Sequence, residues 1–227
     1  RRYLLPGRGE AFIALVASIS LVAVMLGVAA LGGTSATAAV CTPGSLAVGP
    51  IPDSLTTTTR NGETVTLNRQ QLTHAATIIT VGGQTAGVGR DGVLIALMAA
   101  LTESTLRMLA NTSAYPESAN YPNDGNGSDH DSLGLFQMRP QSGWGTVADL
   151  MDSTYQARAF YGGPDGPNYP SPRGLLDIPG WQQMGKGEAA QAVEVSAHPD
   201  RYNNYEPVAL TILTTLTGSG GPVTASP

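Results

Sequence analysis

An uncharged apolar run over residues 11–31 constrains this chain more than any other feature of its sequence. A helix over that run would be about 31 Å long, which is enough to cross the hydrocarbon core of a bilayer. Three arginines lie among residues 1–10, and no Lys or Arg follows the run until Arg60. The positive-inside rule therefore predicts a single-pass anchor with residues 1–10 in the cytoplasm and the remainder outside. A cleaved signal peptide is the alternative, and it also exports the remainder.

Composition excludes several classes of protein. The 227 residues carry a net charge of −5, whereas a nucleic-acid binder would show a basic excess, so no nucleic-acid partner is expected. The chain has a single cysteine, Cys41, which rules out an internal disulfide framework and a Cys-rich zinc module. Neither a metal ion nor a cofactor is expected.

The remainder of the chain divides into a tether, a helical domain and a second tether. Residues 32–62 are rich in Gly, Ser, Thr, Pro and Ala, which predicts a flexible linker. Residues 63–67 alternate as a brief strand does, and Asn68 with Gln71 matches a helix-capping box. Helical spacing recurs up to residue 212, and residues 213–227 are expected to be a flexible linker. We therefore expect a mainly α domain over residues 63–212 with at most a minor β element.

Glu103 stands out within the second predicted helix. Its helical neighbours at three and four residues are small or apolar, namely Ala99, Ala100 and Leu106. A carboxyl in such surroundings has a raised pKa, because burial disfavours the charged form. A glutamic acid with a raised pKa suits general acid catalysis, as in glycoside cleavage. The ordinary alternative is a solvated glutamate on an amphipathic helix.

A two-part motif adds to this interpretation. Glu103 and Ser104 end a helix, and Gly134, Leu135, Phe136 and Gln137 follow after a polar loop. This pattern resembles that of lytic transglycosylases and, more narrowly, the transglycosylase-like domain of actinobacterial and phage cell-wall hydrolases. The resemblance extends over residues 75–208, more than half of the chain. The matching stretches are ALMAALTES, SDHDSLGLFQMRP, GWGTVADLMD, ARAFYGGP, GLLDIPGWQQM and PDRYNNYEPVA.

The resemblance implies a lysozyme-like, mainly α domain that acts on peptidoglycan glycan strands. Glu103 would protonate the oxygen between N-acetylmuramic acid and N-acetylglucosamine. It would then act as a base while the muramoyl 6-hydroxyl attacks, which leaves a 1,6-anhydromuramoyl end. Ser104 would help to position the substrate or orient the carboxyl. Gln137 and the backbone of Gly134, Leu135 and Phe136 would hydrogen-bond the N-acetyl and hydroxyl groups of the sugar. An envelope or secretion machine is a candidate partner.

Several alternatives stay open at the level of sequence. Asp129 or Asp131 would serve as a second carboxylate in a hydrolytic muramidase, or as a substrate contact. Tyr161 flanks a Gly/Pro-rich loop and is a candidate for the cleft, as are Tyr169 and both tryptophans. The loop over residues 115–131 has oxygen ligands that suit a cation, namely Asp124, Asn126, Ser128, Asp129 and Asp131. A non-catalytic wall-binding or scaffold module is the alternative to an enzyme. The late tyrosine of the family falls on Tyr202 or Tyr205.

Overall fold

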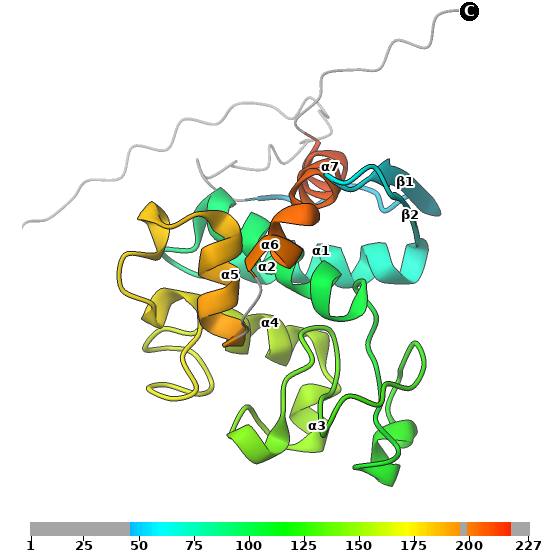
Figure 1. Ribbon diagram of the computed structural model, residues 1–227, viewed down its shortest axis with the longest axis vertical. Coiled ribbons are helices and arrows are strands. Elements are labelled where there is room, and N and C mark those ends of the chain that lie inside the picture. Colours follow the sequence, from blue (N-terminus) through cyan, green and yellow to red (C-terminus); the bar gives the residue numbers. More distant parts are fainter. Residues whose placement is uncertain (1–45, 196–198, 219–227) are drawn as a thin grey trace, which may run out of the picture. The chain divides into compact units, whose positions relative to one another are not determined.

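The computed structural model describes residues 46–195 and 199–218, which are about half helical with one small sheet (Figure 1). The predicted mainly α fold is therefore confirmed. The predicted membrane segment, residues 11–31, lies outside the described part of the chain. Within that part, no helix has the length and apolar character needed to span a bilayer.

The described elements begin with an antiparallel hairpin and continue with helices. The hairpin pairs β1 (Ser54–Thr58) with β2 (Thr64–Asn68). The α-helices are α1 (Arg69–Gln84), α2 (Gly89–Ser104), α3 (Val147–Leu150), α4 (Ser153–Tyr161), α5 (Lys186–Glu194), α6 (Pro199–Asn204) and α7 (Glu206–Thr217). Short 3₁₀ turns occupy η1 (Pro116–Asn120), η2 (Pro140–Ser142), η3 (Leu175–Asp177) and η4 (Trp181–Gln183).

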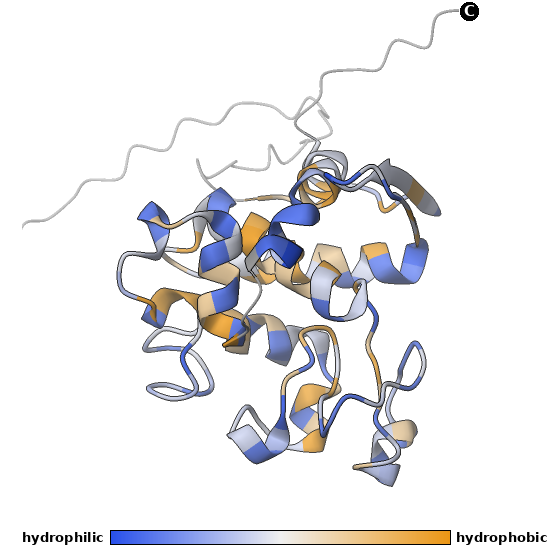
Figure 2. Ribbon diagram, viewed as in Figure 1, coloured by the Kyte–Doolittle hydropathy of each residue, from blue (hydrophilic) through white to orange (hydrophobic). Residues whose placement is uncertain are grey.

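Helix α2 forms the centre of the core. Nearly every side chain from Val93 to Leu101 is buried, and α1, α5, α6 and α7 all pack against this helix. A helix that is apolar on all sides is stable only when other elements surround it. Figure 2 shows this concentration of apolar residues on the central helices, whereas the loops are mostly hydrophilic.

The start of α1 and the end of α2 have local causes. Asn68 caps α1: its side chain accepts from the Gln71 amide, and the Gln71 side chain accepts from the Asn68 amide, so the predicted capping box is confirmed. Helix α2 ends abruptly because Thr105 and Leu106 adopt positive φ values of 55° and 58°. Non-glycine residues rarely adopt this conformation, and it is often found at functional sites.

Described elements extend into both segments that were predicted to be linkers. The threonine-rich segment within residues 32–62 forms β1, because its β-branched residues pair with β2 and Leu55 packs against the core. The end of the domain, predicted at residue 212, lies further on, since α7 continues to Thr217. Leu213 and Leu216 in that extension are fully buried.

Candidate active site

Glu103 lies in the last turn of α2 with a partly exposed side chain. The Tyr202 hydroxyl on α6 donates a hydrogen bond of 2.7 Å to Glu103 Oε1. Tyr202 itself is buried, at 1% exposure, so this hydroxyl is held in a fixed position. The two residues are 99 positions apart in the sequence, and the fold brings them together.

The electrostatic surroundings of Glu103 favour its protonated form. Burial raises the pKa of the carboxyl above its ordinary value, and the negative charge of Asp129 adds to this effect. The Tyr202 hydrogen bond and the positive charge of Arg201 oppose it, but burial prevails. Glu103 is therefore a carboxylic acid that can donate a proton nearer to neutral pH than an ordinary glutamate.

A second glutamate, Glu194, was not predicted from the sequence and interacts with the charge of Glu103. Glu194 ends α5, and its Oε1 is buried without a hydrogen-bond partner among the described residues. Burial, and then the charge of Glu103, raise the pKa of Glu194 well above its ordinary value. The negative charge of an ionised Glu103 therefore disfavours the ionisation of Glu194.

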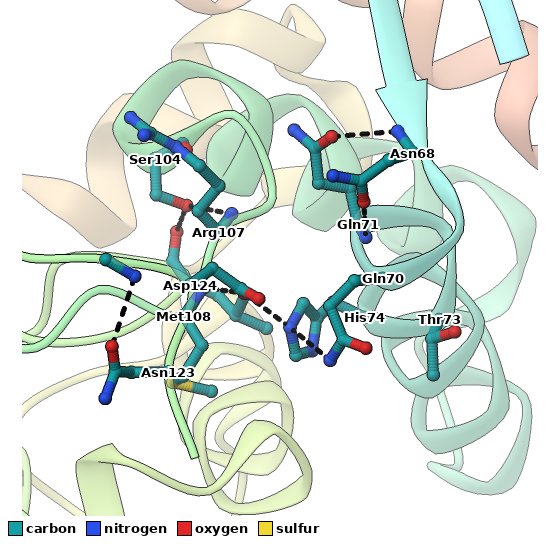
Figure 3. A network of polar contacts seen from close by, with 12 residues as sticks. Asn68, Gln70, Gln71, Thr73, His74, Ser104, Arg107, Met108, Asn123 and Asp124 are labelled. Atoms are coloured by element: carbon teal, nitrogen blue, oxygen red, sulfur yellow. Dashed lines mark hydrogen bonds and ion pairs between the residues drawn. The ribbon is translucent and has the colours of Figure 1, made fainter. Parts of the chain in front are cut away.

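Ser104 connects the end of α2 to the second half of the motif. Its hydroxyl is buried and donates a 2.8 Å hydrogen bond to the Leu135 carbonyl. The same oxygen accepts from the Arg107 amide at 3.1 Å, as Figure 3 shows. The Ser104 hydroxyl thus uses both its donor and its acceptor capacity within the protein. This gives Ser104 a structural contact in place of the predicted substrate contact.

The segment from Gly134 to Gln137 is mostly core. Leu135 and Phe136 are fully buried, and the Phe136 amide donates a 2.9 Å hydrogen bond to Gln156 Oε1. Gly134 has a φ of 75°, and a Cβ there would lie 1.7 Å from Gln156 Nε2. Only a glycine fits this position. Of the four motif residues, Gln137 alone keeps a partly exposed side chain, whereas the side chains of Leu135 and Phe136 belong to the core.

The two aspartates proposed as a second carboxylate occupy different surroundings. Asp131 is 4% exposed, pairs with Arg139, and accepts from the Gln141 amide at 3.1 Å. Burial opposes the ionisation of Asp131, but these hydrogen bonds outweigh it and lower its pKa. Asp129 is exposed, contacts His130 Nδ1 at 2.7 Å, and its charge acts on Glu103. Asp131 is thus a structural residue, and Asp129 is the aspartate whose charge raises the pKa of Glu103.

The aromatic candidates for the cleft differ in how exposed their side chains are. Tyr161 was predicted to line the cleft, and this is wrong: it is fully buried and donates a 2.9 Å hydrogen bond to the Ile78 carbonyl. Burial raises its pKa. Trp181 is likewise a core residue at 4% exposure. Trp144 is partly buried and Tyr169 is exposed, so these two stay available to a ligand.

The proposed cation ligands of the polar loop are largely engaged by the protein. His74 Nε2 and Asp124 Oδ2 are 2.8 Å apart, and the Met108 amide donates to the same carboxylate at 2.8 Å (Figure 3). Asn126 Oδ1 accepts from the Thr112 amide. Within residues 46–195 and 199–218, no three or more His, Cys, Asp or Glu side chains are grouped so as to hold a metal ion.

No protein-family model matches this sequence, and no curated protein sequence matches it.

Two cavities are lined by residues next in sequence to Glu103, Tyr202 and Glu194. One cavity of about 340 Å³ is lined by Thr102 and Arg201, the neighbours of Glu103 and Tyr202. Another, of about 300 Å³, is lined by Val193 and Val195 on either side of Glu194. A larger cavity of about 480 Å³ lies at the end of α1, but none of these titratable groups lines it. We place the site at the carboxyl pair, because proton transfer needs titratable groups rather than volume.

Proposed function

We propose that this domain cleaves peptidoglycan glycan strands between N-acetylmuramic acid and N-acetylglucosamine, with Glu103 as the catalytic acid and base. The observation that carries the proposal is the Glu103 carboxyl itself. It is partly exposed, its pKa is raised by burial, and the buried Tyr202 hydroxyl fixes one of its oxygens. The mainly α architecture supports a lysozyme-like domain, with Tyr202 as the late tyrosine that the resemblance left unplaced.

The proposed reaction uses Glu103 twice. Protonated Glu103 gives its proton to the glycosidic oxygen, and the bond from that oxygen to the muramoyl anomeric carbon breaks. The resulting carboxylate takes the proton of the muramoyl 6-hydroxyl while that oxygen bonds to the anomeric carbon. One chain is thus split into two, one of which ends in a 1,6-anhydro ring, and no water is consumed. The nucleophile is tethered to the reacting sugar, which lowers the entropic cost of attack.

The carboxyl pair supports this non-hydrolytic route. An internal nucleophile needs no second catalytic carboxylate. Asp131 is committed to Arg139, and burial holds the pKa of Glu194 well above its ordinary value, so neither suits the activation of water. Tyr202 holds Oε1 of Glu103, which leaves Oε2 for the substrate. Oε2 of Glu103 is therefore the atom that donates the proton to the substrate.

A hydrolytic muramidase is the second candidate function, and Asp129 favours it. This aspartate is exposed, and its charge acts on the Glu103 carboxyl. A carboxylate on the opposite side of the scissile bond from the acid could activate a water molecule, as in inverting glycosidases. In that case the products would be reducing muramoyl ends.

We further propose that residues 11–31 anchor the protein, or are cleaved after export, and that the domain works outside the cell membrane. The expected substrate is the glycan strand of the wall, and an envelope or secretion machine is the proposed partner. This placement rests on the apolar run and the arginines before it.

Product analysis separates the two reactions. Purified sacculi are digested with the full chain in heavy-oxygen water, and the released fragments are weighed by mass spectrometry. A transglycosylase gives anhydromuramoyl ends without the label, whereas a hydrolase gives reducing ends that carry it. Reducing ends that disappear in Asp129→Asn would replace the first candidate with the second.

A further inference from the structure

We propose that the cavity between the end of α5 and the loops at residues 142–144 and 171–173 binds a carboxylate-bearing muramoyl group, with Arg173 as its anion-binding residue. The inference rests on the proposed function, since it names a part of the substrate that reaches beyond the cleaved bond. The carboxylate is either the lactyl group of muramic acid or an acidic group of a stem peptide. Both present the same chemistry to a guanidinium.

The cavity has both a charged and an apolar side. Its volume is about 300 Å³. It is lined by Ser142, Trp144, Ser171, Pro172, Arg173, Ala192, Val193 and Val195. Trp144, Pro172 and Val195 offer apolar surface for the methyl groups of lactyl and acetyl substituents. Val195 is 87% exposed, so its side chain is accessible to a ligand in the cavity.

The loop that carries Trp144 is held in a defined position. The Trp144 carbonyl accepts a 3.0 Å hydrogen bond from the Tyr155 hydroxyl and another of 3.0 Å from Asn168 Nδ2. The Tyr155 hydroxyl also lies 3.2 Å from Asn168 Oδ1, so three segments of the chain meet at this point. A wall fixed in this way lowers the entropic cost of ordering it around a ligand.

Arg173 has no ion-pair or hydrogen-bond partner for its side chain in the part of the chain that the structure describes. It is exposed, and in the described residues it forms no ion pair or side-chain hydrogen bond, unlike Arg60, Arg69 and Arg139, which pair with carboxylates. No acidic residue lines its cavity. In a chain with a net charge of −5, an unpaired guanidinium in a cavity favours an anion. A planar guanidinium matches a carboxylate through two parallel hydrogen bonds.

The cavity lies at the end of α5, and this helix packs against α2, which carries Glu103. Val193 and Val195 of this segment line the cavity. A glycan whose scissile bond lies at Glu103 would extend another part of itself along α5 toward Arg173. This assignment gives the enzyme a means to distinguish muramoyl units from neutral sugars.

The test measures binding by tryptophan fluorescence. The chain has two tryptophans, of which Trp144 lines the cavity and Trp181 is buried in the core, so Trp144→Phe identifies the signal. Glu103→Gln is used as the background to prevent turnover. It is titrated with N-acetylmuramic acid, with muramoyl dipeptide, and with an N-acetylglucosamine trimer that has no carboxylate.

We expect at least one muramoyl ligand to change the Trp144 signal and to bind more tightly than the trimer. Arg173→Gln should weaken the binding of that ligand about five- to tenfold, as the loss of one carboxylate contact implies. It should leave the binding of the trimer unchanged. Arg90→Gln, at another exposed and unpaired arginine on α2, is the matched control and should bind as the background does. The muramoyl ligand that responds identifies the lactyl or the peptide carboxylate as the source.

Two results overturn the inference: a trimer that binds as tightly as both muramoyl ligands, or muramoyl binding that Arg173→Gln leaves unchanged. A parent that cleaves sacculi without any Trp144 response refutes this cavity and keeps the proposed function. A parent that binds muramoyl ligands through Arg173 but never cleaves sacculi keeps the cavity and refutes the proposed function.

Discussion

Replacing Glu194 with glutamine should change how stability depends on pH. The pKa of Glu194 is raised well above its ordinary value of 4.5 in the folded protein, chiefly by burial. Its protonated form therefore contributes stability that is complete below 4.5 and is lost as pH rises through the folded pKa. Within that window one such carboxyl lowers the free energy of unfolding by about 1.4 kcal/mol per pH unit. Glu103 adds a slope of the same sign.

The assay is urea denaturation at steps from about pH 5 to about pH 8, compared with the parent. Glu194→Gln should lose the part of the slope that Glu194 contributes. Its free energy of unfolding should therefore rise relative to that of the parent as pH rises. Glu188→Gln, at an exposed position on the same helix, is the matched control and should follow the parent. If the stability of Glu194→Gln runs parallel to that of the parent across this range, Glu194 is not a carboxyl with a raised pKa in the folded protein.

Three further substitutions test the site and its support. Tyr202→Phe should lower kcat/KM about ten- to a hundredfold, since a hydrogen bond to a charged group is worth about 1.5–3 kcal/mol. Its pH–rate profile should shift upward, because the lost hydroxyl favours ionised Glu103, and an unmoved profile would argue against the contact. Gly134→Ala should cost more than about 2 kcal/mol in urea denaturation, because its Cβ would strike Gln156 at a positive φ. Asp131→Asn should cost about 1–3 kcal/mol and remove the loss of stability that the parent shows below about pH 4, whereas an unchanged acid transition would count against this pair.

Local patterns predicted the parts of the site that depend on neighbours in the chain. The capping box at Asn68 needs a residue three positions away, and it forms as predicted. The small apolar residues around Glu103 indicated a carboxyl with a raised pKa, which its surroundings give it.

Other parts depend on contacts between distant segments, which no local pattern encodes. By sequence alone, Glu194 is an ordinary glutamate at the end of an amphipathic helix. Only the packing of α5 against α2 exposes it to the charge of Glu103. Tyr161 was misplaced because the Gly/Pro-rich loop after it indicated exposure. Its own helix, α4, points it inward toward Ile78 instead. Composition failed at β1 for a similar reason, since pairing with β2 overrides the linker-like sequence.

The central claim is that the Glu103 carboxyl performs the cleavage. Its most direct test is the rate at which the full chain releases soluble fragments from purified sacculi, measured for the parent, for Glu103→Gln and for Glu117→Gln at an exposed position on η1. Glutamine keeps the shape of the side chain but cannot give or take the proton, so removal of this step should cost at least about a hundredfold in rate. We predict that Glu103→Gln releases essentially nothing while Glu117→Gln matches the parent. Release by Glu103→Gln at the parent rate would contradict the account.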